Sequence, residues 1–194
     1  MKKIEQVYRE ILYQSMERKK KTLTQLGLSK SLGISTSTVN LAMKKLEKMN
    51  AVRIEKMNFT VIDAKKILYL WASTRNIEKD ISYSARIGMA AKEIEKSMPD
   101  IFYAAYSAYK FRFNDVPADY SEVYIYADYA ELQKIKKRFK MSDKNPNFFV
   151  LEKDRNMGKY PKTGTIAQIF VDLWNMKQWY ASDFIKEMEK KIEV

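Results

Sequence analysis

The chain has 194 residues, of which 46% are hydrophobic and 31% charged, and this composition favours a folded core over disorder. It holds 36 Lys and Arg against 24 Asp and Glu, a formal net charge of +12, and it contains no cysteine and no histidine. These absences exclude disulfide bonds, thiolate or imidazole metal sites, Ser-His triads and cysteine nucleophiles. No apolar run is long enough to cross a membrane, and the first residues lack the apolar core of a signal peptide, so a cytoplasmic protein is expected.

The positive charge is concentrated in the first part of the chain. Residues 1–75 contain 16 Lys and Arg against 6 Asp and Glu, whereas residues 76–194 contain 20 against 18. A compact segment with this excess repels itself unless it binds a polyanion, so the asymmetry favours nucleic acid as the partner. A lysine-rich surface that maintains solubility is the alternative, but it does not account for the difference between the two parts.

Two helices separated by a polar stretch are predicted first. Apolar residues at helical spacing indicate a first helix at about Lys3–Arg18. The residues on its apolar stripe are Ile4, Val7, Tyr8, Ile11, Leu12 and Met16. Thr24 is placed to cap a second helix that ends at Leu32, and Gly33 follows where a left-handed residue stops a helix.

A third helix is predicted to begin after Ser35, which caps it, and to end near Asn50, which tolerates the left-handed conformation. Its apolar face holds Val39, Ala42, Met43, Leu46 and Met49. The opposite face and its flanks hold Thr36, Ser37, Asn40, Leu41, Lys44, Lys45 and Lys48. Short hydroxyl and amide groups reach base edges in the major groove, and lysines hold phosphates. Leu41 either meets a thymine methyl group or is an ordinary exposed leucine.

Alternating residues after the third helix predict a β-hairpin with strands near residues 52–54 and 59–61. A hairpin at this place is a wing, and it puts Arg53 and Lys56 within reach of the phosphate backbone or the minor groove. Asp63 is expected to cap a fourth helix that leads to the second part of the chain.

Residues Thr24–Ile62 resemble the winged helix-turn-helix family. Five residues fall where the family's pattern requires them: Ser29, Gly33, Ile34, Val39 and Leu46. The resemblance implies a sequence-specific transcriptional regulator that binds double-stranded DNA. The candidate contact residues are Thr24, Ser35, Thr36, Ser37, Asn40, Leu41, Lys44, Lys45, Lys48, Arg53 and Lys56. Winged helices that bind proteins are the alternative.

The second part mixes strands and helices in roughly alternating order, which predicts helices packed on one sheet. Strands are expected near residues 80–87, 122–128 and 147–154, and helices near residues 89–98, 130–140 and 180–192. Residues 101–113 indicate a strand followed by a helix from Ser107, and residues 165–175 fit either element.

Three stretches of this part resemble the C-terminal domain of AbiEi-type antitoxins and related archaeal regulators: Ala105–Phe111, Pro117–Asp128 and Ala167–Met188. That domain has a degenerate nucleotidyltransferase-like fold. The expected fold is therefore α+β, with a winged helix-turn-helix in residues 1–75 and a nucleotidyltransferase-like α/β domain in residues 76–194. The resemblance makes an antitoxin that represses its own operon an alternative function, and it leaves a homodimer, a toxin or another protein open as a partner.

Catalysis is not expected from this part. A working nucleotidyltransferase needs a Gly-Ser turn for the triphosphate and two carboxylates, one residue apart on the next strand, for two Mg²⁺ ions. Here the turn is Tyr106-Ser107 without the glycine, and Glu122 is followed by Val123-Tyr124. We therefore predict no catalytic residue, no metal ligand and no cofactor, and an active nucleotidyltransferase is the least favoured alternative.

Tyrosines cluster in the second part, at Tyr103, Tyr106, Tyr109, Tyr120, Tyr124 and Tyr126. Aromatic rings among basic residues stack on single-stranded RNA bases in some proteins. They also serve as large fillers of a core or an interface, and this is the interpretation we favour.

Overall fold

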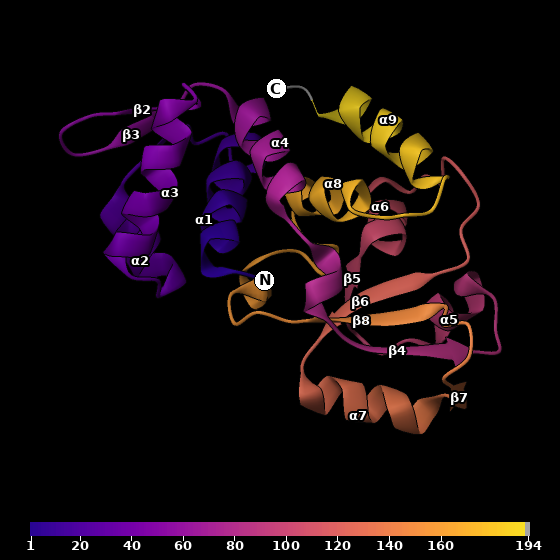
Figure 1. Cartoon of the computed structure of the whole chain (residues 1–194). Helices are drawn as coiled ribbons and strands as arrows, with labels where there is room; N and C mark the ends of the chain where they lie inside the picture. Colours follow the sequence, from indigo (N-terminus) through magenta and orange to yellow (C-terminus); the bar gives the residue numbers. More distant parts are fainter. Residues whose placement is uncertain (193–194) are drawn as a thin grey trace. The chain divides into compact units, whose positions relative to one another are not determined.

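The computed structural model describes residues 1–192 and has a mixed α+β fold, as predicted (Figure 1). The chain divides into two compact units. The first unit contains Met1–Arg75 together with Thr165–Val171, and the second contains Asn76–Gly164 and Asp172–Lys191. The assignment of functional domains to residues 1–75 and 76–194 stays a prediction.

The first unit is mainly helical. Its helices are α1 (Lys3–Leu12), α2 (Gln25–Leu32), α3 (Thr36–Lys48), α4 (Ala64–Thr74) and the part of α8 (Ile166–Trp174) that ends at Val171. A π-helical turn at Tyr13–Glu17 continues α1, so the predicted first helix is present with a wider last turn. The predicted cap of α4 is also present, because the Lys66 backbone N–H donates to Asp63 Oδ1 at 3.0 Å.

Three short antiparallel strands complete the first unit in the order β1-β3-β2. The hairpin consists of β2 (Val52–Ile54) and β3 (Phe59–Val61), as predicted, and the Glu55 N–H donates to the Asn58 carbonyl at 2.9 Å within its turn. The third strand, β1 (Thr22–Leu23), was not predicted. It pairs with β3 through Thr22 opposite Thr60 and Leu23 opposite Phe59.

Buried polar contacts join helices of the first unit. The Arg75 guanidinium lies 2.8 Å from the Glu5 carboxylate, and the Trp71 indole N–H donates to the same carboxylate oxygen at 3.3 Å. Elsewhere on α1, Arg9 is fully buried and donates to Gln168 Oε1 of α8 at 3.2 Å. The Tyr69 and Phe170 rings meet edge to face at 5.6 Å, so α8 supplies both apolar and polar contacts to this core.

The second unit contains a five-stranded sheet in the order β5-β6-β8-β4-β7. The strands are β4 (Ile81–Ile87), β5 (Phe102–Ala104), β6 (Val123–Ala127), β7 (Met141–Ser142) and β8 (Phe148–Glu152). β6 and β8 are parallel, and the other pairs are antiparallel. β7 is a two-residue edge strand that was not predicted.

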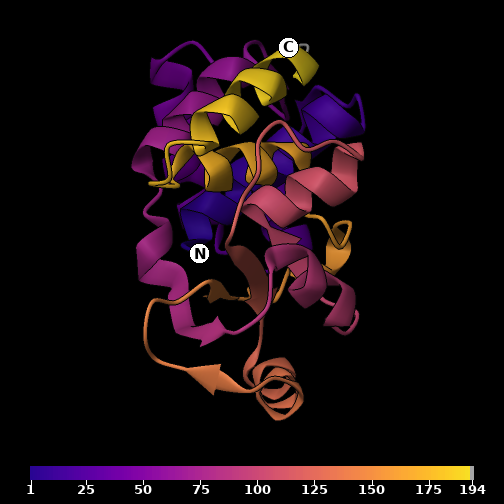
Figure 2. The ribbon, with the colours of Figure 1, turned by 90° about the vertical axis from the view of Figure 1, so that its right-hand side faces the viewer.

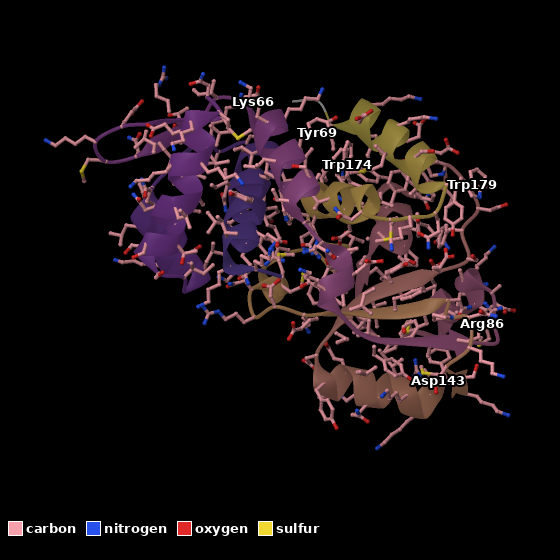
Figure 3. All side chains as sticks on the ribbon, in the orientation of Figure 1. Lys66, Tyr69, Arg86, Asp143, Trp174 and Trp179 are labelled. Carbon is pink, nitrogen blue, oxygen red and sulfur yellow. The ribbon has the colours of Figure 1, made fainter. Side chains whose placement is uncertain are left out.

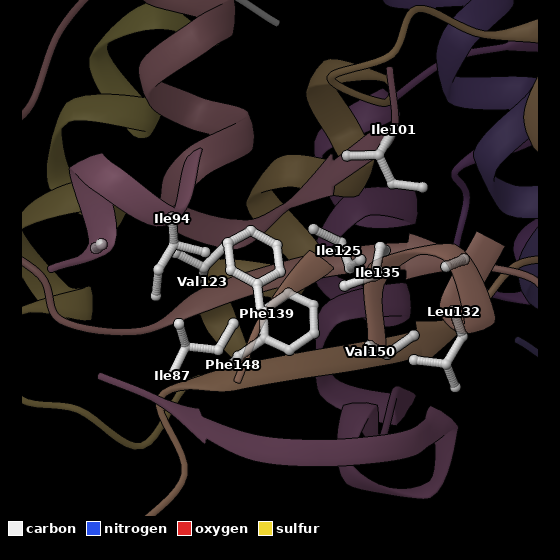
Figure 4. Packing of buried hydrophobic residues seen from close by; sticks show 12 residues of the cluster. Ile87, Ile94, Ile101, Val123, Ile125, Leu132, Ile135, Phe139, Phe148 and Val150 are labelled. Atoms are coloured by element: carbon white, nitrogen blue, oxygen red, sulfur yellow. The ribbon is translucent and has the colours of Figure 1, made fainter. Parts of the chain in front are cut away.

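The helices of this unit are α5 (Ala91–Ser97), α6 (Ala105–Phe113), α7 (Tyr129–Arg138) and α9 (Ala181–Lys191). α7 and α6 with α9 lie on opposite sides of the sheet in both views (Figures 1 and 2). Both faces of β6 are therefore covered, and all five of its residues are buried. On one face Val123 and Ile125 pack in a cluster with Ile94 of α5 and Ile135 of α7 (Figure 4).

The opposite face of β6 carries the tyrosines. Tyr124 and Tyr126 are buried there, Tyr106 of α6 stacks on Tyr120 at 5.4 Å, and its ring meets Phe184 of α9 at 5.1 Å. These rings fill a core, which is one of the two roles, core or interface, favoured from the sequence. Within residues 1–192, no helix is long and apolar enough to span a membrane, and no three acidic side chains form a cluster fit for a metal ion.

Candidate nucleic-acid interface

The turn between α2 and α3 is fixed by side-chain caps and one glycine. The Gly27 N–H donates to Thr24 Oγ1 at 3.0 Å at the start of α2, and the Thr38 N–H donates to Ser35 Oγ at 3.3 Å at the start of α3. Gly33 has φ 59° and ψ 38°, the left-handed conformation predicted for the end of α2. Ser29 Oγ donates to the Ile34 carbonyl at 2.7 Å, so the predicted small residue also holds the turn.

α3 has the two faces that the sequence predicts. Val39, Ala42, Met43 and Leu46 are fully buried, whereas Met49, also predicted to point inward, is half-buried. Ser35, Thr36, Ser37, Asn40, Leu41, Lys44, Lys45 and Lys48 are all exposed. Burial of the apolar face against α1 and α2 leaves the opposite face in solvent, where it can meet a ligand as large as a duplex.

A shallow hollow of about 510 Å³ lies on the exposed face at the start of α3. Its lining residues are Gln25, Thr36, Ser37, Asn40, Leu41 and Lys44. The Asn40 amide is 3.5 Å from Gln25 Oε1, which is long for a hydrogen bond. Both amides thus keep most of their donor and acceptor capacity, and amides of this kind read adenine in the major groove.

Gln25 is a candidate contact residue that the sequence analysis missed. It occupies the first position of α2 and is half-buried beside Asn40. The available signal was its place directly after the Thr24 cap. In a helix-turn-helix, the helix that precedes the recognition helix crosses the DNA backbone, and here that helix is α2, which begins at Gln25.

Thr24 and Ser35 differ from the other candidates because their hydroxyl oxygens already accept backbone N–H groups. Both residues are exposed, and the Thr24 hydroxyl retains a donor that can reach a phosphate oxygen, whereas Ser35 Oγ also lies 3.0 Å from Thr38 Oγ1. Their helix N-termini also favour an anion, because the first N–H groups and the helix dipole point outward there. These two residues are therefore suited to contacts with phosphate, which position the protein on the duplex, and not to contacts with bases.

The wing carries exposed cations. Arg53 lies 3.6 Å from Glu55, but both side chains are well exposed, and such a pair is weak enough to exchange for a phosphate. Lys56 is exposed at the turn, beside Met57, whose exposed fraction of 79% the sequence analysis did not anticipate.

The basic run Arg18–Lys21 is exposed and leads into β1. The Val61 N–H of β3 donates to the Lys21 carbonyl at 2.9 Å, so this run lies beside the wing strands. This run is not among the candidate contact residues predicted from the sequence. Among the described residues, no acidic side chain forms a salt bridge with Lys44, Lys45 or Lys48, and the face is accordingly electropositive.

The family model described as winged helix-turn-helix DNA-binding matches residues 18–53, which extend from the basic run through α2 and α3 to β2. Neither the curated proteins nor the solved structures include a match to this chain. Residues 18–53 are thus similar to the winged helix-turn-helix DNA-binding family, in agreement with the resemblance predicted for Thr24–Ile62.

Proposed function

We propose that the chain is a sequence-specific transcriptional regulator that places α3 in the major groove of double-stranded DNA. The observation that carries this proposal is the exposed face of α3, where small hydrogen-bonding groups at its start give way to three lysines toward its end. Polar side chains at the N-terminal end of a recognition helix contact base edges, and cationic side chains toward its C-terminal end bind the phosphate backbone of the DNA.

The roles follow from side-chain length and position. Ser37 and Asn40 line the hollow and would contact bases, with Leu41 available to a thymine methyl group. Lys45 and Lys48 would hold phosphates beside the groove. Lys56 of the wing would hold the neighbouring backbone, and the cytoplasm is the expected place of action.

The test begins with genome-wide binding of the native protein, which supplies a cognate operator. Asn40→Ala should then weaken operator binding by about 1–3 kcal/mol and leave binding to unrelated DNA unchanged. Lys48→Ala should weaken binding to all sequences and lower the slope of log affinity against log salt by about 1.

Lys65→Ala is the matched control. Lys65 is an exposed lysine of the same unit, but it lies on α4 and not on α3 or the wing. Its affinity and salt slope should equal those of the wild type. Operator affinity that does not respond to Asn40→Ala, or duplex affinity that stays flat as ionic strength rises, would refute the placement of α3.

We propose further that the second unit is a non-catalytic domain of the nucleotidyltransferase-like type that AbiEi-type antitoxins contain. Three positions support the loss of catalysis. Ser107 is fully buried, the Tyr180 hydroxyl donates to the Glu122 carboxylate, and Tyr124 stacks on Phe149 at 4.6 Å. These contacts within the protein support the proposal that the unit binds neither a triphosphate nor a catalytic metal ion there.

This second proposal has its own test. The pure protein should incorporate no nucleotide in the presence of Mg²⁺, and incorporation by the wild type but not by Glu122→Gln would overturn it. A homodimer is an expected arrangement that gel filtration measures directly. Function as an antitoxin stays an alternative that requires a toxin partner, and co-purification with the product of a neighbouring gene is its test.

A further inference from the structure

A pocket of about 430 Å³ lies in the second unit, where the edge strand β7 pairs with the end of β4. Its walls come from the end of β4, the turn after it, and the segment that joins α7 to β7. The volume is within the range of sites for small organic molecules, about 300–1,000 Å³.

The floor of the pocket is apolar and belongs to the core. Ile87 and Phe139 line it and are buried members of the cluster under the sheet (Figure 4). Met89 and Met141 add two flexible apolar side chains, and the Tyr83 hydroxyl lies 3.7 Å from Met141 Sδ. An apolar ring placed here would lose its hydration shell against side chains that are already packed.

The rim of the pocket is cationic. Arg86, Arg138 and Lys140 line it, all three are exposed, and no acidic side chain is among the lining residues. Arg138 donates one N–H to the Ser97 carbonyl at 2.6 Å, which fixes its guanidinium and leaves further donors. Arg86 is labelled in Figure 3 at the end of β4.

The backbone of the pocket is held by a buried amide. Asn147 Oδ1 accepts the Ile87 N–H at 2.8 Å, and Asn147 Nδ2 donates to the carbonyls of Ile87 and Met89 at 3.1 and 3.4 Å. Asn147 is only 4% exposed. The turn that carries Gly88 and Met89 is therefore fixed before any ligand arrives, which lowers the entropic cost of binding.

We propose that this pocket binds a small organic anion, namely a carboxylate or phosphate group attached to an apolar body the size of one or two rings. The apolar part contacts the floor formed by Ile87, Phe139 and the two methionines. The anionic group meets Arg86, Arg138 and Lys140, of which the arginines offer paired N–H donors. This proposal does not depend on the proposed DNA-binding function, because its residues and its test are separate.

The first experiment uses the full chain with ¹³C-methyl methionine and four probes. 1-Naphthyl phosphate and 2-naphthoate should shift the methyl signals of Met89 and Met141 in a saturable manner and leave Met43 and Met188 unshifted, because those two are buried elsewhere. The neutral 2-naphthalenemethanol and inorganic phosphate should each bind about tenfold more weakly, since each lacks one half of the required chemistry. Equal binding of the neutral alcohol, or shifts spread over all methionines, would overturn the proposal.

The second experiment fills the pocket. A Cβ at Gly88 would meet no atom within 4 Å, and neither would a Cβ at Gly158, which lies outside the pocket. Gly88→Leu should abolish naphthyl phosphate binding, whereas the matched variant Gly158→Leu should bind as the wild type does.

Charge removal gives a third, independent comparison. Arg86→Gln should reduce the affinity for naphthyl phosphate about tenfold, the loss of one strong charge-assisted contact. Lys134→Gln removes a charge from the exposed side of α7 outside the pocket and should have no effect. Identical affinities for these two variants, with both folded by circular dichroism, would show that the pocket is not the binding site.

Discussion

The buried ion pair of the first unit allows a quantitative prediction. Arg75 and Glu5 lie 2.8 Å apart, and their side chains are 0% and 6% exposed. Coulomb's law with an effective dielectric constant of about 20 gives about 6 kcal/mol of attraction at this distance. Desolvation of both charges offsets most of this attraction, so the intact pair adds little net stability. Removal of one partner is different, because the desolvated charge that remains has lost its counter-ion.

We therefore predict that Arg75→Met and Glu5→Leu each destabilise the first unit by about 3–5 kcal/mol. The double variant should cost about 2–3 kcal/mol less than the sum of the two single variants, because it leaves neither charge unpaired. The Trp71 N–H, which donates to Glu5, contributes to the cost that remains.

Urea unfolding followed by tryptophan fluorescence measures these free energies. The chain has three tryptophans, and replacing the exposed Trp174 and Trp179 with Phe leaves Trp71 as the reporter of the first unit. The double-mutant cycle is constructed in that background. Additive single effects, or a loss below about 1 kcal/mol for Arg75→Met, would refute the reasoning that the pair is desolvated.

Three further predictions concern local conformation, titration and the interface. Gly33→Ala should cost about 1–2 kcal/mol in thermal or urea unfolding because Gly33 has φ 59°, whereas Gly158→Ala, without a positive φ, should not destabilise the chain. Burial raises the pKa of Tyr103, Tyr124 and Tyr180 to about 12, whereas the unfolded chain releases these protons from about pH 10, so the free energy of unfolding should fall from pH 10 toward pH 12. In the folded protein, the tyrosinate absorbance at 295 nm should rise only well above pH 10, and full titration near pH 10 would contradict this. Ser35→Asp should keep the cap and the stability of α3 but weaken operator binding, because the carboxylate repels phosphate. Ser35→Ala should lose the cap and cost about 1 kcal/mol in free energy of unfolding. Equal DNA affinity for Ser35→Asp and the wild type would place Ser35 away from phosphate.

The helix-turn-helix was predictable because its signals are local. Thr24, Gly33 and Ser35 act on backbone groups within a few residues of themselves, so their roles can be predicted from the neighbouring sequence alone. The two faces of α3 followed from its periodicity alone, since burial of one face exposes the other. The whole candidate set on α3 is exposed for this reason.

The missed strands have no local signal. β1 and β7 contain two residues each, too few for a period-two pattern, and each exists because a partner strand offers hydrogen-bonding groups beside it. Residues 165–175 were ambiguous because a helix that is buried on most of its surface has no polar face to reveal its period.

The start of α6 was placed two residues late for a related reason. Ala105 has φ 47°, so the chain turns sharply from β5 directly into the helix. Alanine gives no sign of a left-handed residue, unlike Gly33 or Asn50, and only the packing of the strand and the helix enforces that conformation.

The position of the exposed face of α3 depends on residues far from it in sequence. α3 packs its apolar side against α1, and α1 carries Glu5 and Arg9, which are held by Arg75 and by Gln168 of α8. The matched family model ends at residue 53 and includes none of these four residues. The orientation of α1, and with it the surface on which α3 rests, is fixed by buried polar groups whose partners lie about 70 and 159 residues away. A change at Gln168 therefore acts on the helix against which α3 packs, although no periodicity or capping rule connects Gln168 with α3.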